Sequence, residues 1–234
     1  NQNKISTENG LSKSNVMVTQ GANQAFVNIV LALCDSNDSV VLFPPYYFNH
    51  RMALQMSISP ENIILGQRDL SMVPDPNWLE KYLSNSNNII PKMIVITNPD
   101  NPTGTVASKS ILEKFASVCK KYNIWMVLDN TYEYFIYDEE AKPFHCIEDN
   151  HILNIFSFSK AYGMMGWRMG YIAYIDQQNM ESEEKEENSS TCWSLESQLL
   201  KCQDTIPICP TIISQHVALG ALEDAGKSWV QFKL

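Results

Sequence analysis

The feature that most constrains the fold is a series of short, almost wholly apolar runs separated by stretches with helical periodicity. The apolar runs cover residues 16–19, 39–43, 62–65, 92–97, 124–128, 152–156 and 170–175. The helical stretches cover residues 22–33, 46–56, 77–83, 108–121, 193–202 and 211–223. Apolar strands that alternate with amphipathic helices predict an α/β fold in which a mostly parallel sheet is sandwiched by helices.

This fold class also predicts where a ligand binds. In open parallel sheets, ligands lie beyond the C-terminal ends of the strands. We therefore expect the loops after five of the apolar runs to converge on one crevice. Those runs end at Thr19, Phe43, Thr97, Leu128 and Phe156.

Size and charge limit the kinds of partner. With 234 residues, 44% of them hydrophobic, the chain is long enough for one large domain, which we assign to residues 1–234. A net charge of -9 argues against a nucleic-acid binder or a protein of anionic membrane surfaces. No apolar run reaches the length of a transmembrane helix. We therefore expect small-molecule partners and a cytoplasmic location.

The cysteines and histidines do not have the spacing of metal ligands. The six cysteines form no C-x-x-C pair and several lie in apolar stretches, as in reduced, mostly buried thiols of an intracellular protein. The four histidines are scattered, at His50, His145, His151 and His216. We expect no metal site. Residues 177–190 are acidic and lack apolar periodicity, which predicts a mobile, solvated insertion.

One loop carries a lysine suited to covalent chemistry. Residues 157–168 read Ser-Phe-Ser-Lys-Ala-Tyr-Gly-Met-Met-Gly-Trp-Arg, directly after an apolar run. The Lys160 amine can form a Schiff base with an aldehyde cofactor. Ser157 and Arg168 can hold that cofactor's phosphate by charge-assisted hydrogen bonds. The segment therefore indicates a pyridoxal phosphate (PLP) site, and the alternative is a loop whose Lys160 and Arg168 are simply solvated.

Three other strand-end loops offer groups that a PLP ring needs. The turn at residues 21–24 opens a helix, so its free backbone N–H groups can receive a phosphate, unless it is an ordinary helix start. Tyr47 follows two prolines and offers an aromatic face for stacking, although such tyrosines also occur in cores and interfaces. Asn101 lies between prolines in the loop at residues 98–104 and can donate its amide to a phenolate oxygen.

Asp129 ends the apolar run at residues 124–128. A charge in that position is costly unless it is paired, and a protonated pyridine nitrogen would be a suitable partner. Tyr132, three residues later, can hydrogen-bond the phenolate oxygen of the same ring. Alternatively, Asp129 caps the turn that follows it, because Asn130 and Thr131 are typical turn residues.

Together, these motifs resemble the class I/II aminotransferases, which are PLP-dependent enzymes of fold type I. They read GANQAF, PPYYF, NPDNPTG, LDNTYEYF and SFSKAYGMMGWRMGY, in the order of that family. The resemblance is to the plant-type aromatic or methionine aminotransferases, with kynurenine aminotransferases as more distant relatives. It runs from Val16 to Tyr174 and resumes from Lys201 to Leu222, which implies the large domain of an aspartate aminotransferase-like fold.

The resemblance implies three catalytic residues. Lys160 would bind PLP and then act as general base and acid in the proton shift on the substrate. Asp129 would keep the pyridine nitrogen protonated, and Tyr132 would hydrogen-bond the phenolate oxygen.

It also implies a set of cofactor-binding residues besides those three. Asn101 would share the phenolate oxygen with Tyr132, and Tyr47 would stack on the ring. The phosphate would be held by Ser157, Arg168 and the backbone of Ala22 and Asn23.

The implied reaction moves an amino group between an aromatic or methionine-like L-amino acid and a 2-oxo acid, in a homodimer. Two other reactions use the same anchor residues, namely C–S bond lysis and aminocyclopropane-carboxylate synthesis. A dinucleotide-binding fold is disfavoured because the first apolar run is not followed by G-x-G-x-x-G.

The chain departs from the family pattern at its two ends. From the resemblance, we expect residues 1–234 to include neither the N-terminal arm nor the C-terminal small domain, and with the latter not the arginine that binds the substrate carboxylate. We interpret the chain as a fragment of a complete enzyme, and the alternative is a truncated, non-catalytic PLP-binding paralogue.

Overall fold

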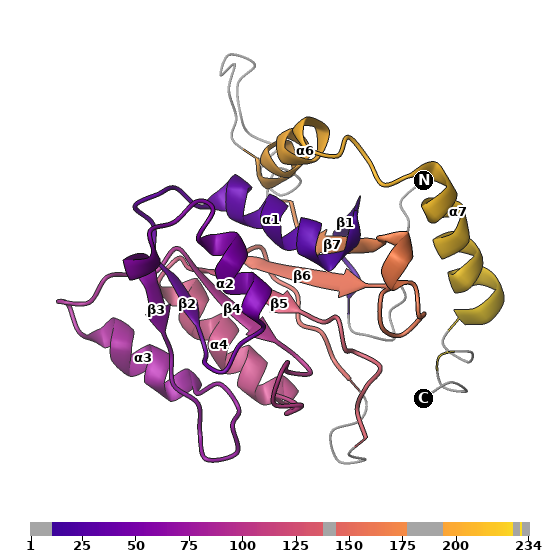
Figure 1. Ribbon diagram of the computed structural model, residues 1–234. Coiled ribbons are helices and arrows are strands. Elements are labelled where there is room, and N and C mark those ends of the chain that lie inside the picture. The colour runs from indigo at the N-terminus through magenta and orange to yellow at the C-terminus, as the bar shows by residue number, and fades with distance from the viewer. Residues whose placement is uncertain (1–10, 138–143, 177–193, 227–229, 231–234) are drawn as a thin grey trace.

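In the computed structural model, one sheet lies between two layers of helices (Figure 1). The structure describes residues 11–137, 144–176, 194–226 and Val230. The strands are β1 (Asn15–Thr19), β2 (Val40–Leu42), β3 (Ile63–Leu65), β4 (Met93–Thr97), β5 (Trp125–Asp129), β6 (Ile152–Ser157) and β7 (Gly170–Tyr174). The α-helices are α1 (Gly21–Leu33), α2 (Phe48–Leu54), α3 (Pro76–Ser84), α4 (Lys109–Lys121), α6 (Leu195–Thr205) and α7 (Ile212–Gly220). Shorter helical turns are η2 (Pro60–Asn62), η4 (Met165–Trp167) and η5 (Ala221–Ala225).

The strand order confirms the predicted mostly parallel sheet. The order is β1-β7-β6-β5-β4-β2-β3, and neighbouring strands from β6 to β3 are all parallel. Strand β7 is antiparallel to both β6 and β1, so β1 runs in the same direction as β6. The C-terminal ends of β1, β2, β4, β5 and β6 therefore lie along one edge of the sheet, as the apolar runs predicted.

Both faces of the sheet are covered, which explains why the strands are apolar throughout. Along β4, Met93 and Val95 pack in the core formed with α1, α2 and α6. Ile94 and Ile96 point to the opposite core, formed with α3 and α4. Full burial of each such side chain contributes roughly 1.5–3 kcal/mol. The alternating side chains of a single strand thus hold both helical layers.

A chain of buried amides fixes α1 to its neighbours. The Asn28 side chain accepts from Gln24 at 2.6 Å and donates to the Gln203 side chain on α6 at 2.8 Å. Gln203 in turn donates to the Val18 carbonyl of β1 at 3.2 Å. Because these groups are paired, their burial carries no unsatisfied polar atom, and they hold α1 in register with the end of β1.

Helices α2, α6 and α7 differ from the sequence-based prediction at their ends: α2 ends at Leu54 rather than near residue 56, α6 at Thr205 rather than near residue 202, and α7 at Gly220 rather than near residue 223. Helix α2 begins at Phe48 rather than near residue 46, because Tyr47 is the N-cap and has an extended backbone, with φ -61° and ψ 119°. Helix α6 begins at Leu195, where the Ser194 side chain accepts from the Ser197 amide at 3.0 Å.

The remaining expectations concern cysteines and surface segments. Cys34, Cys119 and Cys146 are buried as predicted, Cys202 is half-buried, and Cys209 is exposed. Burial raises the pKa of the Cys34 thiol to about 12. The predicted acidic insertion at residues 177–190 lies outside the described residues. Within the described ranges, no helix is long and apolar enough to cross a membrane, and no three His, Cys, Asp or Glu residues are arranged to hold a metal ion.

Candidate active site

The predicted site residues lie in the loops where the parallel strands end. Asp129 is the last residue of β5 and Ser157 the last of β6, while Tyr47 directly precedes α2. Burial raises the pKa of Tyr47, and a hydrogen bond from the Asn23 side chain partly opposes this effect. The charges of Asp129, Tyr132 and Arg168 also influence that pKa, so residues distant in the sequence meet here.

Asp129 is a buried carboxylate with a full set of donors. Its Oδ2 lies 3.1 Å from His50 Nε2, while its Oδ1 accepts from the Thr131 amide at 3.1 Å and the Thr131 hydroxyl at 2.6 Å. Burial alone would raise its pKa, but the His50 and Thr131 hydrogen bonds outweigh burial and lower it. Asp129 is therefore ionised at neutral pH. The turn cap considered as an alternative role is present at Oδ1, and Oδ2 faces His50.

His50 is a site residue that the sequence analysis set aside as one of four scattered histidines. It is buried on α2, where its ring packs against Phe26 at 4.5 Å and Tyr47 at 5.3 Å between centroids. It positions the Asp129 carboxylate through the 3.1 Å contact. The only sequence signal was its place one helical turn after Tyr47, which puts both residues near the same helix face.

An amine, a phenol and an amide converge from three loops. Asn101 Nδ2 lies 3.5 Å from the Tyr132 hydroxyl. Lys160, which is exposed, places its Nζ 5.9 Å from the centre of the Tyr132 ring. The structure thus brings Lys160, Tyr132 and Asn101 together, as expected for loops that follow the C-terminal ends of parallel strands.

The start of α1 closes the other end of the site. Gly21 has φ +81°, and a Cβ on Gly170 would lie 2.7 Å from the Gly21 carbonyl carbon and 2.8 Å from the Ala22 amide nitrogen. Gly170 therefore lets β7 pass against the first turn of α1, and Gly21 adopts the positive φ and leaves room for the Arg168 guanidinium. Gly170 is paired with Thr19 on one side and Ser157 on the other, which places the Ser157 hydroxyl beside this turn.

Arg168 completes this end. Its guanidinium donates to the Gln20 carbonyl at 3.4 Å and the Met165 carbonyl at 2.8 Å, beside the first turn of α1. Arg168 has φ +54°, an unfavourable backbone conformation for a non-glycine residue that is often found at functional sites. The first turn of α1 has no acidic side chain. A guanidinium, a hydroxyl and free helix N–H groups together suit a dianionic phosphate.

The side chains of this site suit each functional group of PLP in turn. Ionised Asp129 suits a protonated pyridine nitrogen, and the Asn101–Tyr132 pair suits a phenolate oxygen. The turn beside Arg168 suits the phosphate, and the Lys160 amine suits the aldehyde. The arrangement can therefore support amine chemistry on a carbonyl cofactor.

Comparison with known proteins gives a consistent set of relatives. The sequence profile described as "Aminotransferase class I and II" matches residues 6–233. The chain is 48% identical over 229 residues to an aromatic aminotransferase of Arabidopsis thaliana, covering 97% of this chain and 53% of that protein. It is 28% identical over 223 residues to an aspartate aminotransferase of Thermotoga maritima, covering 94% and 54%.

Solved structures show the same fold. The chain superposes on a mutant of Thermus thermophilus aspartate aminotransferase with a TM-score of 0.78 at 24% identity, covering 96% of this chain and 55% of the other. For an aromatic aminotransferase from Pyrococcus horikoshii, the TM-score is 0.77 at 23% identity, with 98% and 59% covered. The chain spans about half the length of the curated relatives it matches.

Proposed function

Since this chain belongs to the class I and II aminotransferase family, whose members use PLP, we propose that it transfers an amino group between an aromatic or methionine-like L-amino acid and a 2-oxo acid. The observation that carries the proposal is the convergence of Lys160 and ionised, buried Asp129 at one sheet edge. The 48% identity to an aromatic aminotransferase supports the substrate class.

We assign the cofactor to the residues described above. When bound, PLP supplies an electron-withdrawing ring that stabilises negative charge on the substrate Cα. Asp129, held ionised by His50 and Thr131, would keep the proton on the ring nitrogen. Asn101 and Tyr132 would donate to the phenolate oxygen, and Tyr47 would cover the ring. Ser157, Arg168 and the backbone of Ala22 and Asn23 would hold the phosphate.

Lys160 carries out the proton transfer in this scheme. Its amine is exposed and reaches the Tyr132 ring, so it is available both to bind the cofactor aldehyde and to contact the substrate. As a free amine, Lys160 would take the proton from the substrate Cα as a general base, and the ammonium so formed would act as the general acid of the proton shift.

The alternatives raised by the sequence receive no support from the comparisons. The named relatives are aminotransferases rather than C–S lyases or aminocyclopropane-carboxylate synthases. We further propose that the chain corresponds to the PLP-binding large domain.

Assembly and location are also proposals. Phe48 and Met52 are 64% and 56% exposed and lie one turn apart on α2, so they form an apolar stripe beside Tyr47, and Met56, 74% exposed, follows the end of the helix. A second subunit of the same chain would bury this stripe, which supports a homodimer. Cytoplasmic location is supported by the free thiols of the described cysteines.

The half-reaction tests the proposed activity. The PLP-loaded chain is mixed, without any acceptor, with phenylalanine, tyrosine, tryptophan, methionine or aspartate, and the cofactor absorbance and the 2-oxo acid product are followed. We expect conversion by the aromatic amino acids and methionine, and none by Lys160→Ala. Pyruvate and ammonia released from a cysteine conjugate would indicate the lyase instead. PLP binding without conversion of any amino acid would contradict the proposed activity.

A further inference from the structure

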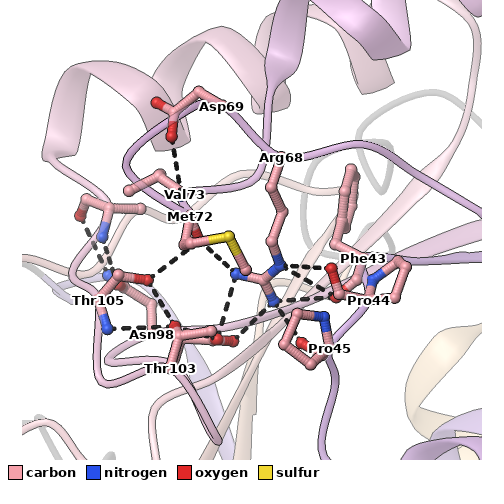
Figure 2. A network of polar contacts seen from close by, with 12 residues as sticks. Phe43, Pro44, Pro45, Arg68, Asp69, Met72, Val73, Asn98, Thr103 and Thr105 are labelled. Carbon is pink, nitrogen blue, oxygen red and sulfur yellow. Dashed lines mark hydrogen bonds and ion pairs between the residues drawn. The ribbon is translucent and has the colours of Figure 1, made fainter.

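Arg68 follows the outer strand β3, yet its side chain is only 5% exposed. Figure 2 shows its guanidinium between the segment that contains Phe43, Pro44 and Pro45 and the segment that contains Met72. Neither Arg68 nor its partner Asp100 was singled out by the sequence analysis. A buried, fully charged group outside the proposed cofactor contacts calls for a reason.

On one side, Arg68 fixes the loop that leads from β2 to α2. Its Nε donates to the Pro44 carbonyl at 3.0 Å, and its Nη2 donates to the carbonyls of Phe43 and Pro45 at 2.9 and 2.7 Å. Prolines have no N–H with which to fix a loop by their own hydrogen bonds. The Arg68 guanidinium is therefore a shared hydrogen-bond donor for three successive carbonyls of this loop. Tyr47 lies two residues after the last of them.

On the other side, Arg68 fixes the loop after β4. Its Nη2 and Nη1 lie 3.1 Å from Oδ1 and Oδ2 of Asp100, a two-point contact in which the carboxylate is only 4% exposed. Asp100 Oδ2 also accepts from the Thr103 hydroxyl at 2.6 Å, which closes the loop around the neighbouring Asn101.

We infer that Arg68 and Asp100 are a positioning pair that fixes Tyr47 relative to Asn101, and hence the orientation of the cofactor ring. The inference rests on the proposed function, because those two residues are assigned to the ring. It gives the loop after β3 a role in the site, although none of its residues is assigned to PLP.

Only arginine has the donors that this arrangement uses. The guanidinium is planar and contacts four carbonyls and both carboxylate oxygens at once, whereas a lysine ammonium has three donors and no fork. Stability alone is a weak explanation, because a buried ion pair often stabilises a protein no more than apolar side chains do. Positioning explains why these particular loops are joined.

The test uses Arg68→Lys, Asp100→Asn and the double variant. The control is Glu148→Gln, because Glu148 accepts from Ser12 and Ser14 and so affects stability far from these loops. For each folded protein, PLP is titrated, and the visible circular dichroism of the bound cofactor and its dissociation constant are recorded. Binding of inorganic phosphate is measured separately by its competition with PLP.

We expect each single variant to bind PLP about tenfold more weakly, as for a lost charge-assisted hydrogen bond. The circular dichroism band should shrink, and the inhibition constant of phosphate, calculated from the competition with the PLP dissociation constant of each variant, should stay unchanged. The double variant should lose less than the sum of the two single losses. Glu148→Gln should lower the unfolding midpoint but leave the cofactor band intact.

Two results would overturn the inference. One is wild-type affinity and circular dichroism in both single variants, which would leave the proposed function intact. The other is failure of both variants to fold while Glu148→Gln folds, which would make the pair a folding determinant. Absence of PLP binding in the wild-type chain would instead reject the proposed function itself.

Discussion

Replacement of Asp129 by Asn tests whether hydrogen bonds or burial decide the pKa of the Asp129 carboxyl group. The change keeps the size of the side chain and an oxygen for Thr131, but it removes the charge and places an amide opposite His50. Hydrogen bonds to a charged group contribute about 1.5–3 kcal/mol each, and burial of the charge offsets part of this. Because the donors outweigh burial, we expect the cofactor-free variant to be about 1.5–3 kcal/mol less stable than wild type at pH 7.

The pH dependence of the stability difference separates the two explanations, because hydrogen bonds and burial shift the pKa of Asp129 in opposite directions. The pKa of Asp129 is lowered in the folded chain, so its stabilising contribution is complete above the pKa of the unfolded chain, about 3.9. That contribution is lost as the pH falls through the lower, folded pKa. Urea unfolding should therefore show the same wild-type advantage at pH 7 and pH 5, and a smaller one near pH 3.

If burial outweighed the hydrogen bonds, the pKa of Asp129 would be raised instead of lowered. The variant would then be more stable than wild type at pH 7, and the difference in stability would already change between pH 7 and pH 5. Either observation would refute the reasoning. His50→Phe tests the same contact from the other side, because it keeps an aromatic ring against Phe26 and leaves Asp129 Oδ2 without its donor.

Three further predictions follow from the same structure. In Gly170→Ala, the new Cβ would press on the first turn of α1, so we expect a loss of about 1–3 kcal/mol in urea unfolding and weaker phosphate competition. Tyr132→Phe removes the hydroxyl that contacts Asn101, and we expect about 10- to 100-fold slower half-reactions, with phosphate competition unchanged. Glu148 has a lowered pKa because its hydrogen bonds to Ser12, Ser14 and Lys13 outweigh burial, so Glu148→Gln should reduce stability at pH 7, with the difference shrinking as the pH falls below about 4.5.

The sequence predicted those features that depend on local pattern. Apolar runs such as residues 93–97 specify strands buried on both faces, and strand direction then places Asp129 and Ser157 at one edge. Lys160, Tyr132 and Asn101 were found because each lies in a loop at a strand end.

The features that were missed depend on contacts between distant residues. His50 meets Asp129 across 79 positions, and Arg68 meets Asp100 across 32. Both contacts follow from the spatial order of β5, β4, β2 and β3, which periodicity does not specify. The close approach of Gly170 to the start of α1 likewise depends on β7 inserting between β1 and β6.

The central claim is that Lys160 is the residue that binds the cofactor. The direct measurement is to add one equivalent of PLP, reduce with borohydride, and locate the added mass by peptide mapping. Lys109→Ala, in an exposed helical ion pair, serves as the control beside Lys160→Ala. We predict one adduct at Lys160 in the wild type and in Lys109→Ala, and none in Lys160→Ala. An adduct spread over surface lysines, or one that persists in Lys160→Ala, would contradict the account.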